Sequence, residues 1–191
     1  GKCDLFFNNA GIAAFTGRIE DIPIQEAHNI VNINLNGVIN GVYKVLPLLK
    51  NTNQSMIINT GSVGSFLPVP GAAVYSATKF AVRGLTEGLN IEFAKHGIEV
   101  SELNPWFTET PILDAKQSTP LMDGALQRDV IKSKSVIHTT EKVAKRVFKI
   151  YHTRSIHNVV GFTGNLAVFI MRYCPAIIRR MSRKMYADYF S

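Results

Sequence analysis

Cysteine is scarce in this chain of 191 residues, and long apolar runs are absent. The two cysteines, Cys3 and Cys174, lie near opposite ends and lack the close spacing of a metal site, so we predict no bound metal. Free thiols indicate a reducing compartment, which we take to be the cytoplasm. No apolar run reaches the roughly 18–20 residues that a bilayer-spanning helix needs. The composition, 46% hydrophobic and 18% charged, is that of an ordinary globular domain.

Acidic residues are outnumbered by basic ones, 14 to 21, and the net charge is +7. The basic excess lies late in the chain, in residues 132–149 and 172–184. Such a balance favours a nucleic acid, an anionic membrane or a phosphorylated cofactor as a partner. Aromatic residues do not alternate with basic ones as on a base-stacking surface, so we predict no nucleic-acid partner. An initiator methionine is also lacking, and we interpret Gly1 as a cut boundary.

Short strand-like segments alternate with longer helical ones. Strands are predicted over residues 4–9, 55–62, 98–105 and 157–162, and helices over residues 24–49, 74–96 and 139–151. Gly97 stands where a left-handed residue ends a helix, and Thr139 with Glu141 marks a helix start. The alternation predicts an α/β fold in which helices cover both faces of a parallel sheet. Residues 1–191 then form one domain, with residues 116–135 as a lid.

Polar residues gather where the predicted strands end. They form three clusters, Asn8–Gly11, Thr60–Ser62 and Asn104–Pro105. In open α/β sheets ligands bind outside the carboxyl ends of the strands. The clusters therefore predict a ligand site at that edge of the sheet.

Tyr75 and Lys79 stand four residues apart on a predicted helix, so they share a face. A nearby positive charge favours phenolate and is expected to lower the pKa of Tyr75 from about 10. A tyrosine tuned in this way transfers a proton at an alcohol or carbonyl oxygen. Ser62 follows the preceding strand and is placed to hydrogen-bond the same oxygen. A Tyr-x-x-x-Lys pair alone also occurs by chance as the polar side of a packed helix.

Four motifs in order resemble the short-chain dehydrogenase/reductase family. They are "NNAG" at Asn8–Gly11, "NLNG" at Asn34–Gly37, a serine thirteen positions before a tyrosine, and "YSATK" at Tyr75–Lys79. The resemblance runs from the first residue to about Thr110. It implies a Rossmann-like fold and an oxidoreductase that uses NAD or NADP, with NADP favoured, to interconvert an alcohol and a carbonyl compound. A catalytically silent binding or scaffold protein is the alternative. An epimerase or dehydratase is disfavoured, because the tail is too short for the larger substrate lobe of those enzymes.

The resemblance implies a role for each matching residue. Tyr75 is the general acid/base, and Lys79 lowers its pKa while it hydrogen-bonds the nicotinamide ribose. Ser62 orients the substrate oxygen, and Asn34 holds a water in a proton relay. Asn34 is also readable as a polar residue that bonds backbone at a helix kink, and the two roles are compatible. Ser65 is interpreted as decoration of the substrate loop.

The family's cofactor contacts fall on five further positions. Asn9, Ala10 and Gly11 lie beside the adenosine half, and Pro105 and Thr110 lie at the nicotinamide end. Asn9 to Gly11 are equally readable as a strand-end turn that supports the sheet.

Two departures from the family pattern stand out. No G-x-x-x-G-x-G turn between a strand and a helix is present, so the amides that hold a pyrophosphate are missing and the sheet is predicted to be incomplete at its N-terminus. Trp106 replaces the glycine that usually follows Pro105, and a tryptophan does not adopt glycine's positive φ cheaply. We therefore expect Trp106 and Phe107 to wall the substrate or cofactor, which favours an apolar alcohol or carbonyl substrate.

Residues 164–191 are predicted to form an amphipathic helical tail broken at Pro175. Its apolar stripe comprises Leu166, Phe169, Ile170, Tyr173, Ile177, Ile178, Met181 and Met185, with basic residues beside it. Such a stripe usually packs into a core or between subunits, here as a homodimer or homotetramer. A basic amphipathic helix also lies on membrane surfaces, so peripheral membrane contact is the alternative.

Overall fold

A computed structural model describes residues 1–13, 19–69, 71–114, 131–132 and 135–190. Its centre is a parallel sheet in the order β1-β2-β3-β4, so each strand pairs with the next along the chain. The strands are β1 (Leu5–Asn8), β2 (Met56–Thr60), β3 (Glu99–Asn104) and β4 (His157–Val159). Met56, Ile57 and Ile58 of β2 are wholly buried, as expected for a parallel strand that is covered on both faces. The predicted α/β fold is confirmed.

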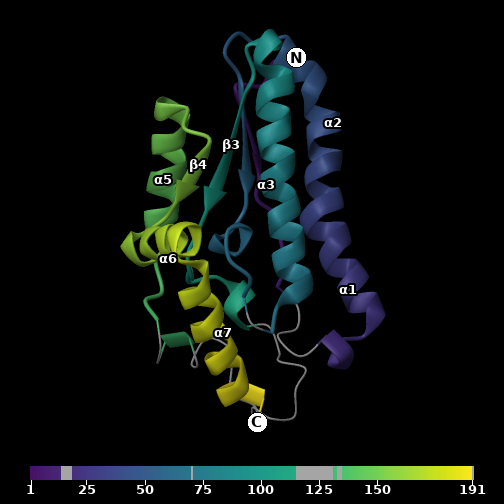
Figure 1. The fold of residues 1–191 in the computed structure, drawn as a ribbon. Helices are drawn as coiled ribbons and strands as arrows, with labels where there is room; N and C mark the ends of the chain where they lie inside the picture. Colours follow the sequence, from purple (N-terminus) through teal and green to yellow (C-terminus); the bar gives the residue numbers. More distant parts are fainter. Residues whose placement is uncertain (14–18, 70, 115–130, 133–134, 191) are drawn as a thin grey trace.

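Helices cover the two faces of the sheet unequally (Figure 1). On one face lie α1 (Ile24–Val31), α2 (Gly37–Lys50) and α3 (Ala73–Phe93), and α2 and α3 pack on Ile57 and Val100. On the other face α5 (Thr140–Thr153) packs through Ile150 on Met56, Ile58 and Leu103. Four short helical turns also occur among the described residues: η1 (Ile19–Asp21), η3 (Val63–Ser65), η4 (Ala94–His96) and η5 (Pro111–Asp114).

The predicted helix over residues 24–49 is not continuous. A π-helical turn, η2 (Asn32–Asn36), separates α1 from α2. The periodicity did not reveal it because the apolar residues keep their spacing across it, and such turns often mark functional sites. Gly97 adopts φ 67° after η4, and the side chain of Thr139 accepts a hydrogen bond from the N–H of Lys142, so both predicted helix boundaries are confirmed. The predicted lid, residues 116–135, lies almost entirely outside the described residues.

Two helices follow the sheet, α6 (Phe162–Tyr173) and α7 (Pro175–Phe190), and the break falls at Cys174, directly before Pro175. In Figure 1, α7 extends beyond the end of the sheet. Leu166, Phe169 and Tyr173 are exposed, so this part of the stripe does not join the core of the described chain. Of the helices that the structure describes, each is too short or too polar to cross a membrane.

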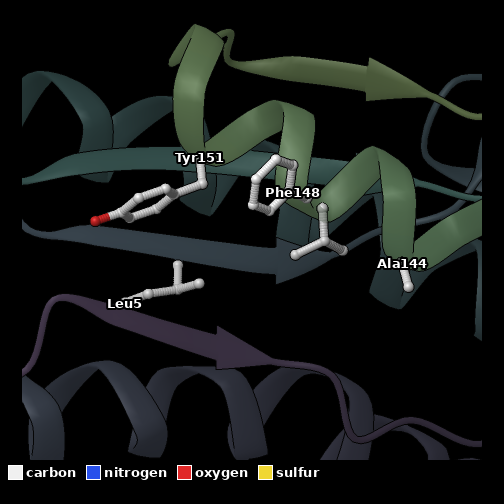
Figure 2. A pocket seen from close by; sticks show the side chains of 5 residues that line it. Leu5, Ala144, Phe148 and Tyr151 are labelled. Carbon is white, nitrogen blue, oxygen red and sulfur yellow. The ribbon is translucent and has the colours of Figure 1, made fainter.

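An apolar hollow of about 300 Å³ opens between β1 and α5. Figure 2 shows Leu5 pointing from β1 toward Phe148 and Tyr151 of α5, and Ala144 and Val147 complete the lining. Leu5 stands at the amino end of β1. The hollow is therefore separate from the polar clusters, which follow the carboxyl ends of the strands.

Candidate active site

The loops that follow β1, β2 and β3 are tied together at the carboxyl edge of the sheet. Thr60 Oγ1 donates to Asn9 Oδ1 at 3.1 Å, which joins the ends of β2 and β1. The backbone N–H of Ser62 donates to Asn104 Oδ1 at 3.1 Å, and that of Val63 donates to the carbonyl of Pro105 at 3.1 Å. The three predicted polar clusters thus form one edge, as adjacent parallel strands require.

Ser62 is held in a small capping motif at the start of η3. Its Oγ accepts from the N–H of Gly64 at 3.0 Å, and its own N–H also reaches Ser65 Oγ at 3.1 Å. Ser65 is wholly buried. The interpretation of Ser65 as decoration was therefore wrong: it fixes the backbone that carries Ser62.

Tyr75, in the first turn of α3, lies beside Ser62, because a Cβ on Gly64 would be 3.3 Å from Ser62 Oγ and 3.6 Å from Tyr75 Cε1. Burial raises the pKa of Tyr75, and the Ser62 hydrogen bond opposes that rise only in part. The sequence predicted a lowered pKa through Lys79, which this chain does not show. The physical reason is desolvation, which penalises phenolate more than its polar neighbours stabilise it.

Lys79 is 4% exposed and lies one turn further along α3. Its Nζ donates to the carbonyl of Thr60 at 2.8 Å and lies 5.7 Å from the centre of the Tyr75 ring. Burial lowers the pKa of Lys79 to about 8, against an opposing attraction from Glu102. The side chain is thus a buried amine that titrates near pH 8, next to the candidate acid.

Asn34 sits in the π-helical turn and is wholly buried. Its amide exchanges two 2.8 Å hydrogen bonds with the backbone of Ile12, and it also donates to Thr78 Oγ1 at 3.3 Å. A Cβ on Gly11 would lie 3.4 Å from Asn34 Oδ1 and 3.6 Å from Lys79 Nζ. Asn34 therefore holds the loop after β1 next to Lys79. This agrees with the prediction that Asn34 is a polar residue that bonds backbone at a helix kink.

The residues expected to contact a dinucleotide are spread along this edge. Asn9 and Ala10 are exposed, Gly11 and Pro105 are half-buried, and Thr110 Oγ1 donates to the carbonyl of Thr108 at 3.3 Å. An ammonium has three N–H donors, and Thr60 accepts one of those of Lys79. This donor set fits a ribose beside Lys79, and the absence of a side chain on Gly11 leaves room next to it. The described residues fit the nicotinamide half of a dinucleotide better than its phosphates.

The indole ring of Trp106 is fixed by a hydrogen bond and by a ring contact. Its Nε1 donates to Ser135 Oγ at 2.8 Å, and its ring meets Phe107 edge-on at 5.2 Å between ring centres. A Cβ on Gly164 would lie 3.6 Å from the indole, so Trp106 packs toward α6. Whether Trp106 and Phe107 wall a substrate stays a prediction.

One buried group near the site was missed in the sequence. Glu102 is wholly buried in β3 and bonds Asn104 Nδ2 at 3.0 Å. The available signal was weak, because the strand over residues 98–105 holds two acids, Glu99 and Glu102, and only the second is buried.

Comparison with known proteins places this geometry in a family. Residues 1–121 match the short chain dehydrogenase family. Levodione reductase of Leifsonia aquatica is 35% identical over 114 residues, 60% of this chain and 43% of the relative. Two solved structures with bound dinucleotides are also similar. A short-chain dehydrogenase/reductase of Burkholderia phymatum in complex with NAD has a TM-score of 0.78 at 26% identity, over 93% of this chain and 68% of that one. A gluconate 5-dehydrogenase of Burkholderia cenocepacia in complex with NADP and tartrate has a TM-score of 0.69 at 27% identity, over 84% and 64%.

The chain spans less than half of the length of levodione reductase. The matched region contains all four sequence motifs and each residue of the Ser62, Tyr75 and Lys79 constellation. The chain belongs to the short-chain dehydrogenase family.

Proposed function

We propose that the protein of which this chain is a part interconverts a secondary alcohol and a ketone with NAD or NADP. The observation that carries the proposal is that Ser62 and Tyr75 both border Gly64, close to the buried Lys79. This arrangement offers a proton donor, a hydrogen bond for the reacting oxygen and a positive charge in one place. It is the requirement for proton transfer at a carbonyl oxygen.

In this proposal the residues act in sequence on the substrate oxygen. Ser62 and Tyr75 hold the ketone oxygen between their hydroxyls, and Tyr75 donates its proton as negative charge develops there. The raised pKa of Tyr75 keeps the phenol protonated at neutral pH, so it begins as an acid. Lys79 stabilises the phenolate that remains and binds the ribose. A bound nicotinamide supplies the hydride for reduction and accepts it in the reverse direction.

The substrate is proposed to be apolar. Leu67 and Phe66 follow Ser62 on the loop, and Trp106 and Phe107 follow Pro105 across the same edge. These side chains favour a hydrocarbon skeleton over a polyol. Levodione reductase and gluconate 5-dehydrogenase differ in the substrate that their names give, so the choice rests on these side chains.

The test uses the full-length protein, titrated with NADH and NADPH by fluorescence and then assayed with levodione and cyclohexanone. Binding of one dinucleotide and its oxidation on addition of a ketone are expected. If the protein binds neither dinucleotide, the proposal is rejected and the alternative, a catalytically silent scaffold protein, is favoured. Binding without turnover of a wide ketone panel also favours the scaffold.

The proposed partners include a second copy of the chain and an anionic lipid surface. Tyr43 on α2 and Ile91 on α3 are 75% and 78% exposed on the outer side of the helical layer, which supports self-association through these helices. Light scattering of the full-length protein at several concentrations is the direct test, and a monomer throughout rejects it. The exposed apolar and basic surface of α6 and α7 supports the lipid contact, which is argued with its test in the Discussion.

A further inference from the structure

One row of the sheet is polar across all four strands. Asn8, Asn59, Glu102 and His157 are partners in the strand register, one from each strand. Asn8 Nδ2 donates to Asn59 Oδ1 at 2.9 Å, and Asn59 Nδ2 donates to Thr86 Oγ1 of α3 at 3.0 Å. A parallel sheet that is covered on both faces normally presents apolar side chains at such positions. The row lies just inside the carboxyl edge that carries the candidate site.

Glu102 is the charged centre of this row. Its Oε2 accepts hydrogen bonds from Asn104 Nδ2 at 3.0 Å and faces His157 Nδ1 at 3.1 Å. Its Oε1 is buried without a hydrogen-bond partner. A buried carboxylate is costly unless an opposite charge and hydrogen bonds compensate it, so its counter-charge has to be identified.

Besides His157, whose Nδ1 lies 3.1 Å from Glu102 Oε2, the buried cation available to Glu102 is Lys79. Among the residues whose placement the structure describes, Glu102 is the only buried acid and Lys79 the only buried lysine or arginine. Both groups meet the same short backbone segment at the end of β2. Lys79 Nζ binds the carbonyl of Thr60, and a Cβ on the next residue, Gly61, would overlap Glu102 Oε1. The attraction of Glu102 for the Lys79 ammonium agrees with this placement.

Glu102 is also linked to Ser62 by hydrogen bonds through the side chain of Asn104. Asn104 Nδ2 donates to Glu102, which leaves Asn104 Oδ1 turned toward the N–H of Ser62 at 3.1 Å. Without the carboxylate, either end of the Asn104 amide is free to face Ser62, and an amide NH₂ there repels the Ser62 N–H.

Three residues, His157, Glu87 and Arg83, form a surface branch that connects the Glu102 carboxylate to the solvent-exposed side of α3. His157 Nε2 lies 2.9 Å from Glu87 Oε1, and Arg83 Nε lies 3.1 Å from the same oxygen. The charged and titratable groups around Glu102 are thus Lys79, Arg83 and Glu87 on α3 and His157 on β4. The side chain that it meets in the row on β2 is the neutral Asn59.

We propose that Glu102 is a positioning residue of the active site, which orients Ser62 through Asn104 and serves as the buried counter-charge of Lys79. The proposal deepens the proposed function and rests on it. Glu102 touches neither substrate nor cofactor in this scheme. It acts on the two groups that do.

The test compares Glu102→Gln with the full-length wild-type protein. Lysine labelled with ¹³C at Cε is followed by NMR as the pH rises, and the Lys79 signal is the one missing from Lys79→Arg. We expect the Lys79 signal of Glu102→Gln to titrate at a lower pH than in the wild type, because the charge that favours the ammonium is removed. For the ketone that the wild type reduces, we expect kcat to fall about tenfold or more, the loss of roughly one charge-assisted hydrogen bond.

Three further variants make the result specific. Glu102→Asp keeps the charge and is expected to restore the Lys79 titration toward that of the wild type. Glu87→Gln changes only the exposed end of the branch and is expected to leave both kcat and the Lys79 titration unchanged. Asn104→Ala breaks the link to Ser62, so we expect kcat to fall about tenfold, as for one lost buried hydrogen bond, with the Lys79 titration unmoved.

The proposal is overturned if Glu102→Gln keeps both the wild-type kcat and the wild-type Lys79 titration. A lower melting temperature without a change in kcat or in the Lys79 titration has the same meaning, because it shows a purely structural role. If Glu102→Gln does not fold, wild-type kcat in Asn104→Ala overturns it instead. The NMR titration needs no substrate. A shifted Lys79 signal in a protein that reduces no ketone therefore supports the charge pair while rejecting the proposed function.

Discussion

Tyr75 lies beside Ser62, and its hydroxyl is the part of the side chain that the proposed reaction uses. In Tyr75→Phe we expect turnover to fall by about 10²–10⁴-fold, the usual share of a general acid. Binding of NADH or NADPH is expected to stay nearly unchanged, because the ring and Lys79 remain. Steady-state kinetics and fluorescence titration measure the two quantities. Tyr43→Phe, on the exposed side of α2, is the matched control, and wild-type turnover in Tyr75→Phe refutes the assignment.

Lys79 connects the protonation of the site to cofactor affinity. Its pKa is lowered to about 8 by burial, so the free protein carries the ammonium below that pH and loses it above. If the ammonium binds the ribose, the Kd for the dinucleotide rises with pH above about 8, by up to roughly tenfold per pH unit. Lys79→Arg keeps its charge at every such pH. If the Kd of Lys79→Arg rises with pH as much as the Kd of the wild type does, the loss of the Lys79 charge is not the cause of the rise.

Much of the site was predictable at this scale because its spacings are local. Tyr75 and Lys79 are one helical turn apart, Ser62 follows a predicted strand, and Asn104 ends another. The pKa of Tyr75 and the place of Glu102 were not predictable, since both depend on burial by elements far apart in the sequence. Whether Asn9, Pro105, Thr110 and the other predicted contacts bind a dinucleotide stays a prediction.

At the scale of elements, α2 approaches β1 unusually closely at Gly41. A Cβ there would overlap Asn8 Oδ1 and lie 3.0 Å from Phe6 Cε1. We expect Gly41→Ala to lower the free energy of unfolding by about 1–3 kcal/mol, because the added methyl group displaces the Asn8 amide, which is hydrogen-bonded to Asn59, and presses on the Phe6 ring. Gly84→Ala in α3 is the matched control: its Cβ meets nothing within 4 Å, and a helical alanine is favoured there by about 0.5–1 kcal/mol. Urea unfolding measures both, and a stabilised Gly41→Ala contradicts the close approach.

The elements themselves were predicted well where the pattern is local and less well where tertiary contacts intervene. The strands and α3 follow from apolar runs and helical spacing, and Gly97 and Thr139 end and begin helices as their chemistry predicts. The π-helical turn at Asn32–Asn36 did not follow, because the buried hydrogen bonds of Asn34 to Ile12 decide it. The same turn brings the loop after β1 to Lys79, so the misread element is one that builds the site.

For the whole molecule, the surplus of positive charge and the exposed apolar stripe coincide on α6 and α7. Leu166, Phe169 and Tyr173 recur every three or four residues on one face of α6 and are exposed. Ile177 and Met181 continue this exposed apolar character on α7. The cations of this region are exposed as well: Arg172, Arg179, Arg180, Arg183 and Lys184. A second copy docked here would bring like charges together, whereas an anionic lipid surface satisfies both the charge and the apolar stripe.

We therefore expect the full-length protein to sediment with vesicles of phosphatidylserine and phosphatidylcholine but not with phosphatidylcholine alone. Because each basic residue near an anionic surface contributes about 1 kcal/mol, Arg179→Gln with Arg183→Gln is expected to weaken binding about tenfold or more. Phe169→Ser is expected to weaken it through the lost apolar contact, and added salt weakens it through screening. Phe148→Ser removes an equally exposed aromatic from α5 and serves as the control. Sedimentation that is indifferent to lipid charge, or loss of a dimer in Phe169→Ser, assigns the stripe to subunit packing instead.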